Sequence, residues 1–193
     1  MGQRHQIYVR LADKSVIGIH HQWLWGITAV CRLANYLNFT MTADEPLNKT
    51  EALDRLALCY SIDMQTGYYH DVHKLDDEET INPEKTDNNN GITLIDLSGK
   101  TPKYCFMSLH HLECLDKSIA EQCEQGEEPF KNMQPMDVDK WISLHYSKKD
   151  FNKFQGTDKP SYKKALKIVK TFNVMSHKDC QKMFPKIEGS FIK

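Results

Sequence analysis

The sequence predicts an α+β fold, with an antiparallel or mixed sheet built from two hairpins and about five helices packed on it. Residues 5–12 and 15–25, and later 92–97 and 104–109, have the strand patterns of two hairpins, each with a short connection. Between and after these segments, apolar residues recur at the spacing of amphipathic helices. A chain of 193 residues that is 40% hydrophobic is long enough for one core, so we expect residues 1–193 to form a single domain.

The first hairpin decides which histidines face the core. We interpret Asp13 and Lys14 as a two-residue turn between its strands. This turn would pair Ile7 with His20 and place His20 on the apolar face, with His21 on the opposite face. A slip of one residue would exchange the two faces, so the assignment depends on the turn.

Five segments show helical spacing or capping signals. Asn48 and Glu51 form a capping box in its Asn variant, and Asp137 is a favourable N-cap. The predicted helices cover residues 28–38, the segment between Asn48 and Gly67, residues 112–124, a segment that begins after Asp137, and residues 161–172.

Charge is unevenly distributed along the chain. The formal charge is +3 over residues 1–39, −13 over 40–139 and +9 over 140–193. Residues 70–90 are predicted to be a polar, acidic loop, and 137–193 a basic helical part. Such segregation indicates either an anion-binding region or two parts of one fold that attract each other.

The cysteines and the apolar runs indicate a cytoplasmic protein without a membrane segment. No apolar run approaches the roughly 20 residues that span a bilayer, and the first residues lack the apolar centre of a secretory signal. The six cysteines form no CxxC pair, so we expect reduced thiols. They are Cys31, Cys59, Cys105, Cys114, Cys123 and Cys180.

The first candidate site lies at one end of the first hairpin. Imidazoles supply donors or a general base, and indole rings offer stacking area for a ligand. The ligand-binding candidates are Gln6, Gln22 and Trp23, and the catalytic candidates of an alternative, enzymatic hypothesis are His5, His20 and His21. The simpler interpretation is that one strand face is core and the other bonds to its neighbours.

The second candidate site is a lysine face on the last predicted helix. Lysines on one face attract phosphates through counterion release. The chain has no arginine after Arg55, so nucleic-acid contact would be non-specific. The phosphate or nucleic-acid candidates are Lys163, Lys164, Lys167 and Lys170. A solvated face of an amphipathic helix explains the same pattern.

A zinc site is the third candidate, kept as an alternative to a protein with no cofactor. His70 and His73, and then His111 and Cys114, are pairs of potential ligands three residues apart. The spacings of zinc fingers are absent, so no metal is favoured.

These observations favour a binding or assembly protein over an enzyme. We expect its charge-segregated surface to meet a protein partner or a larger assembly. A viral or phage accessory protein from an AT-rich genome, in the host-cell cytoplasm or the virion, would fit these observations as a whole. The alternative is a metal- or histidine-dependent enzyme that acts on nucleotides or nucleic acid. The common phosphate-loop and nucleophile motifs are missing from the sequence.

Overall fold

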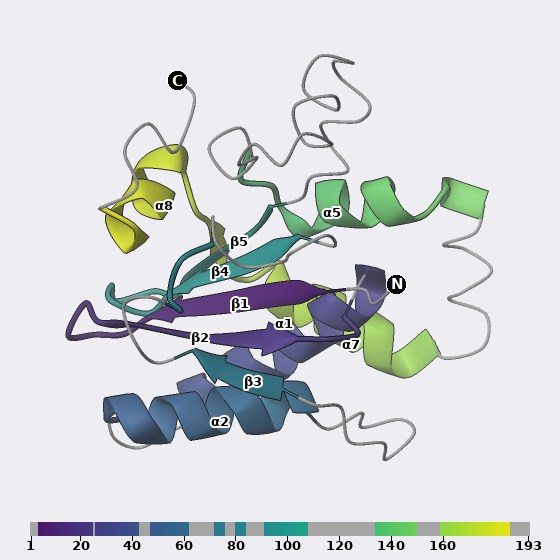
Figure 1. Cartoon of the computed structure of the whole chain (residues 1–193). Coiled ribbons are helices and arrows are strands. Elements are labelled where there is room, and N and C mark those ends of the chain that lie inside the picture. The colour runs from purple at the N-terminus through teal and green to yellow at the C-terminus, as the bar shows by residue number, and fades with distance from the viewer. Residues whose placement is uncertain are drawn as a thin grey trace.

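A mixed sheet of six strands forms the centre of the described structure and confirms the predicted α+β fold (Figure 1). The computed structural model describes residues 4–24, 26–42, 47–61, 72–75, 80–83, 91–107, 134–149 and 159–185. The strands are β1 (His5–Arg10), β2 (Val16–His21), β3 (Val72–Leu75), β4 (Ile92–Asp96), β5 (Lys103–Met107) and β6 (Asn173–Val174). The helices within these ranges are α1 (Gly26–Met41), α2 (Lys49–Ser61), α5 (Val138–His145), α7 (Lys159–Val169) and α8 (His177–Met183).

The strand order is β3-β2-β1-β4-β5-β6, and both predicted hairpins are present. β1 pairs with β2, β2 with β3, and β4 with β5 in antiparallel orientation. β1 and β4 are parallel, as are β5 and β6. The parallel contact between β1 and β4 joins the two hairpins into one sheet, which is why the sheet is mixed.

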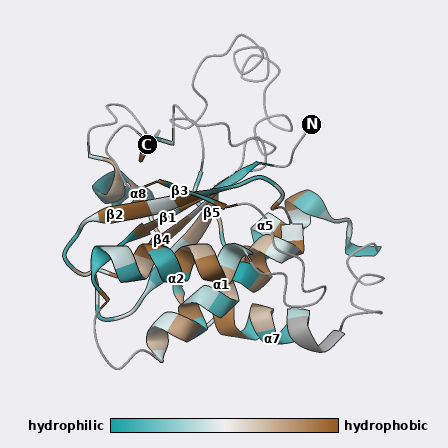
Figure 2. Cartoon of the chain, turned by 60° about the horizontal axis from the view of Figure 1, so that its bottom comes forward, coloured by the Kyte–Doolittle hydropathy of each residue, from teal (hydrophilic) through white to brown (hydrophobic). Residues whose placement is uncertain are grey.

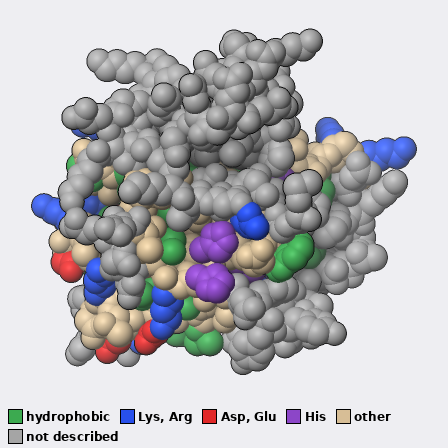
Figure 3. All heavy atoms as spheres, viewed as in Figure 1, with side chains coloured by type: hydrophobic (Ala, Val, Ile, Leu, Met, Phe, Trp, Pro, Cys, Tyr) green, Lys and Arg blue, Asp and Glu red, His purple; other side chains and the backbone are tan. Residues whose placement is uncertain are grey.

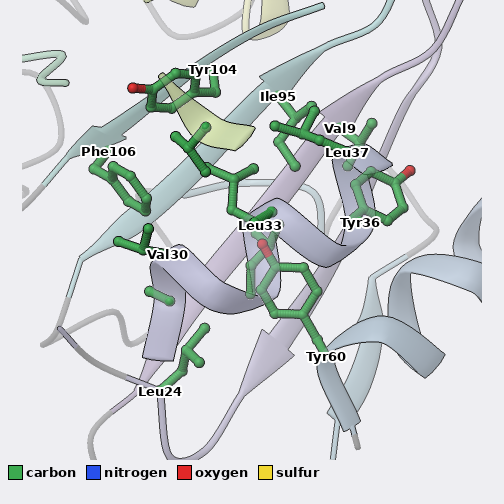
Figure 4. Packing of buried hydrophobic residues seen from close by; sticks show 14 of the residues in the cluster. Val9, Leu24, Val30, Leu33, Tyr36, Leu37, Tyr60, Ile95, Tyr104 and Phe106 are labelled. Atoms are coloured by element: carbon green, nitrogen blue, oxygen red, sulfur yellow. The ribbon is translucent and has the colours of Figure 1, made fainter. Parts of the chain in front are cut away.

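The main core lies between one face of the sheet and four helices. Figure 2 shows α1, α2 and α7 in front of the sheet, with α8 behind it. Side chains of α5 join the same core as those of α1, α2 and α7. Figure 4 shows how Leu33 and Leu37 of α1 pack against Val9 of β1 and Ile95 of β4. Strand alternation explains why every second residue of β1 contributes to this core.

A smaller core covers the opposite face of the sheet. Tyr8 and Leu94 belong to it from the strands, and Cys180 and Met183 belong to it from α8. The ring of Tyr8 meets Phe184 edge-to-face, with the centroids 5.2 Å apart. The sheet is therefore packed on both faces, and this second face is the one that leads to the candidate site.

The first hairpin has a longer turn than predicted, and its register is shifted by one residue. Leu11 N–H donates to the carbonyl of Ser15 at 2.8 Å, and Lys14 N–H donates to the carbonyl of Leu11 at 2.9 Å. Three residues therefore form the loop, with Lys14 at a left-handed φ of 71°. The prediction of a two-residue turn was therefore wrong. The third loop residue shifts the pairing of β1 with β2 by one position.

The shifted register exchanges the two histidines of β2. Gln6 lies opposite His20, and His5 lies opposite His21. His20 therefore shares the face of Gln6 and Tyr8, and His21 shares the face of the main core. This is the reverse of the predicted assignment, and it follows from the side-chain period of two.

The predicted helix starts at Asn48 and Asp137 are confirmed. Glu51 N–H donates to Asn48 Oδ1 at 3.0 Å, and Asn48 N–H donates to the Glu51 carboxylate at 3.3 Å, which completes the capping box. Asp137 Oδ1 accepts from Lys140 N–H at 2.8 Å at the start of α5.

Part of the predicted acidic loop is a strand. Residues 70–90 were expected to lack regular structure, but Val72–Leu75 forms β3 at one edge of the sheet. The predicted helix over 112–124 lies outside the described residues. None of the helices in the described ranges has the length and apolar character that crossing a bilayer requires.

Candidate functional site

The histidines of the first hairpin divide between the interior and the surface. His5 and His21 face the main core and are 0% and 1% exposed, whereas His20 is only half-buried. His5 Nε2 lies 2.8 Å from the hydroxyl oxygen of Thr93 on β4. The His5 ring also meets Trp141 of α5 edge-on, with the centroids 5.6 Å apart. These contacts give His5 a packing role between the sheet and α5.

Both ring nitrogens of His21 take part in hydrogen bonds. The backbone N–H of Trp23 donates to Nδ1 at 3.0 Å, and Nε2 lies 3.1 Å from the carbonyl oxygen of Tyr60. Because Nδ1 accepts, the ring proton must be on Nε2, where it can be donated to the carbonyl. The neutral Nε2–H tautomer of His21 thus links β2 to the last turn of α2.

Gln6 is fully buried on the other face of β1, beside His20. Its Oε1 accepts a hydrogen bond from the hydroxyl of Tyr8 at 3.2 Å. Of the predicted ligand-binding residues, Gln6 is therefore buried next to His20. Gln22 and Trp23 lie nearer to solvent, with Trp23 53% exposed.

His20 has a second imidazole beside it that the sequence did not indicate. His73 of β3 lies directly opposite His20 in the antiparallel pair, with the ring centroids 6.2 Å apart and the planes at 35°. His73 is exposed. Figure 3 shows two histidines side by side on the surface, with a Lys or Arg side chain close to them.

The described charged groups that act on His20 are both positive. Partial burial, the nearby imidazole of His73 and the guanidinium of Arg4 all lower the pKa of His20, and a hydrogen bond with Gln22 offsets part of this. We define the hairpin-end patch as Arg4, His20, Gln22, Trp23 and His73. It combines two imidazoles, a guanidinium and an amide with the exposed indole of Trp23, which follows the end of β2 by two residues.

Three of the four predicted lysines lie on α7, and Lys170 directly follows its last residue. Lys163, Lys164, Lys167 and Lys170 are all exposed. The opposite side of the helix contributes buried residues to the main core: Tyr162, Ala165 and Val169. Lys170 Nζ lies 2.7 Å from the carboxylate of Asp139 on α5, so part of this positive charge is used within the fold. The other three lysines point to solvent as a row on one helix.

One residue of the predicted zinc set, His73, belongs to the described part of the chain. His70, His111 and Cys114 lie outside the described residues, and His73 is the described member of that set. Within the described ranges, no three His, Cys, Asp or Glu side chains are grouped so that they could hold a metal ion. The structure instead brings His73 next to His20.

Comparisons with known proteins do not identify the chain. No protein-family model, no curated protein and no solved structure matches it.

Proposed function

We propose that this protein is a binding protein and that the hairpin-end patch is the surface that contacts its partner, which we take to be another protein. The observation that supports this proposal is the combination of Trp23, 53% exposed, with Arg4 and a half-buried His20. Trp and Arg dominate the energetics of protein interfaces, because each supplies a large contact area together with hydrogen bonds.

The packing behind the patch supports this assignment. His21 fixes the backbone of Trp23 through the 3.0 Å bond to Nδ1, and the Tyr8 hydroxyl bonds to Gln6 beside His20. A surface whose supporting residues are buried and hydrogen-bonded loses little conformational entropy when a partner binds.

Photocrosslinking tests the location of this surface. A photoreactive phenylalanine analogue replaces Trp23 in the full chain, which is then irradiated in an extract of the cells that produce it. The matched control places the same analogue at Leu58 of α2, which is 51% exposed. We expect a discrete protein adduct from position 23 that disappears when R4Q and H73N are added. Equal adducts from both positions, or none from position 23, would contradict the proposal.

A second candidate function is non-specific nucleic-acid binding through α7, favoured by the row of exposed lysines. The test is binding of single-stranded DNA by the K163Q/K164Q/K167Q variant against a K14Q/K49Q/K100Q control, which removes the same charge from exposed sites elsewhere. If the lysine face contacts phosphates, the logarithm of the binding constant falls linearly with the logarithm of the salt concentration. The K163Q/K164Q/K167Q variant should then reduce the magnitude of this slope by about two to three. Equal slopes for the two variants contradict this function.

The enzymatic alternative stays a prediction. Of its three histidines, His5 and His21 are buried, so His20 is the one that a substrate could reach from this surface. Loss of a measured phosphodiesterase or nucleotidase activity in H20A would support it, and unchanged activity in that variant would remove the mechanism.

A further inference from the structure

The geometry of His20 and His73 suits a ligand that accepts hydrogen bonds from two rings. The residues are directly opposite each other on β2 and β3, and their ring centroids are 6.2 Å apart. Side chains opposite each other in an antiparallel pair share one face of the sheet. Each neutral imidazole has one N–H donor and each protonated one has two, so both rings can donate to one acceptor group.

Arg4 belongs to the same face. It precedes β1 by one residue, and it shares the parity of Gln6, which lies opposite His20. Its guanidinium acts on His20 electrostatically. Arg4 thus adds a permanent positive charge with fork geometry, which suits carboxylate and phosphate groups.

Among the described residues, the charges that act on His20 are those of His73 and Arg4, and both are positive. His73 on β3 and Arg4 ahead of β1 both oppose protonation of His20, in addition to its partial burial. Lys74, which follows His73 on β3, forms an ion pair with Asp54 of α2. Two positive charges that lie close together in a partly buried site repel each other. An anion bound between them is attracted to both, so the site favours an anion. A metal cation would instead meet the charge of Arg4.

We infer that the hairpin-end patch binds an oxyanion, a carboxylate or a phosphate, between His20, His73 and Arg4, with uptake of a proton at His20. This inference rests on the proposed function, since it names the group of the partner that the patch recognises. Binding and protonation are then thermodynamically linked, so affinity for the anion rises as the pH falls.

The test follows the histidine ring resonances of the full chain by NMR during pH titrations. One titration contains inorganic phosphate, another contains a short glutamate peptide, and a third contains sodium chloride at the same ionic strength. We expect the pKa of His20 to rise by about one unit with at least one oxyanion, which corresponds to tenfold tighter binding to the protonated form. His177, half-buried on α8, is the internal control.

Two variants separate the contributions of the patch. R4Q and H73N each remove one positive neighbour and should abolish most of the oxyanion-dependent rise. If the pKa of His20 is the same in all three titrations, the inference is overturned. Perturbation of both rings by stoichiometric zinc in the absence of any oxyanion effect overturns it as well, in favour of a metal site.

The outcomes of this test and of photocrosslinking are distinguishable. A protein adduct at position 23 without any oxyanion effect keeps the proposed function and removes the inferred ligand chemistry. An oxyanion effect without a protein adduct keeps the anion site and removes the protein partner. The phosphate and glutamate titrations show which source of the oxyanion the site prefers.

Discussion

His21 Nε2 lies 3.1 Å from the carbonyl oxygen of Tyr60, so a histidine of β2 hydrogen-bonds to a backbone carbonyl in the last turn of α2. Its neighbour His20 points to the other face of the sheet, where it is half-buried beside His73. Two adjacent residues of the same type thus have different roles, one in the fold and one in the candidate site. The difference arises from strand alternation alone.

Alanine substitutions should separate these roles. H21A removes two hydrogen bonds and buried ring volume, so we expect the free energy of unfolding to fall by about 2–4 kcal/mol. H20A should change it by less than about 1 kcal/mol, because the ring is half-buried and has like-charged neighbours. Urea unfolding followed by circular dichroism measures both. A larger loss for H20A than for H21A would contradict the assignment of faces.

The turn before β2 offers a stabilising substitution. Lys14 has a φ of 71°, a conformation that costs roughly 1–2 kcal/mol for a residue with a side chain. Glycine adopts this φ without that cost, but it loses more conformational entropy than lysine when the chain folds. We therefore expect K14G to raise the free energy of unfolding by about 0.5 kcal/mol. K14A, which lacks the lysine side chain but keeps the Cβ, should give no such gain in the same urea experiment.

The length of this turn sets the register of the hairpin, which the sequence pattern did not determine. Alternation in β1 and β2 and the capping box at Asn48 depend on neighbouring residues, and both were predicted correctly. The register depended on whether two or three residues form the turn. Because Lys14 occupies a position where glycine is usual, the three-residue turn had no recognisable signal. The assignment of His20 and His21 to faces was reversed for that reason.

The rest of the candidate site depends on contacts between distant segments. His73 reaches His20 because β3, a strand of four residues, pairs with β2 about fifty positions earlier in the sequence. Such a short strand beside an acidic run has too little alternation to be recognised. The seven-residue α8 did have a signal, since Ser176 and Asp179 form a capping box, but the helix is too short for a clear apolar period.

A buried thiol pair joins α8 to the sheet. Cys105 Sγ of β5 lies 3.7 Å from Cys180 Sγ of α8, and both residues are 0% exposed. We expect the oxidant diamide to join them in a disulfide, with two thiol hydrogens transferred to diamide. Because burial raises the pKa of the Cys105 thiol, the reaction should be slow and should accelerate in low urea as α8 opens.

Peptide mapping by mass spectrometry identifies the product of this oxidation. A link between Cys105 and Cys180 should be found in the wild type and should be missing in C180S. The link closes a loop of 75 residues, so it should also raise the free energy of unfolding, by up to about 4 kcal/mol. Diamide treatment that leaves these two thiols reduced in low urea would contradict the prediction.

Asp179 makes the docking of α8 dependent on pH. Burial raises the pKa of this carboxyl, but hydrogen bonds from Ser176 and Lys103 outweigh burial and hold the pKa below its ordinary value of 3.8. A depressed pKa contributes stability that is fully present above the unfolded value and is lost as the pH falls through the folded value. The contribution should therefore decrease below about pH 4.

The D179N variant provides the comparison. It keeps a side chain of similar size but lacks the negative charge opposite Lys103 Nζ, which lies 3.1 Å from the carboxylate. At pH 6 we expect D179N to be less stable than the wild type by about 1 kcal/mol. This difference should shrink towards pH 2.5 in urea titrations. A difference that is constant over this range would show that the charge of Asp179 does not contribute.

Tyr60 and Tyr104 provide a matched pair of buried phenols. The Tyr60 hydroxyl is buried without a hydrogen-bond partner among the described residues, and burial raises its pKa well above the ordinary value. The Tyr104 hydroxyl accepts from Val138 N–H at 3.3 Å at the start of α5, and its pKa is raised to about 12, chiefly by burial. The same Tyr→Phe change therefore removes an unsatisfied polar atom in one case and a hydrogen bond in the other.

The two substitutions should have opposite effects on stability. Y60F should raise the free energy of unfolding by up to about 1 kcal/mol, because a desolvated hydroxyl without a partner is unfavourable. Y104F should lower it by about 1 kcal/mol, because the first N–H of α5 loses its acceptor. Urea unfolding of both variants beside the wild type gives the comparison. If Y60F were as destabilising as Y104F, the Tyr60 hydroxyl would have to bind an internal water or another group, and the interior between α1 and α2 would be more polar than its packing indicates.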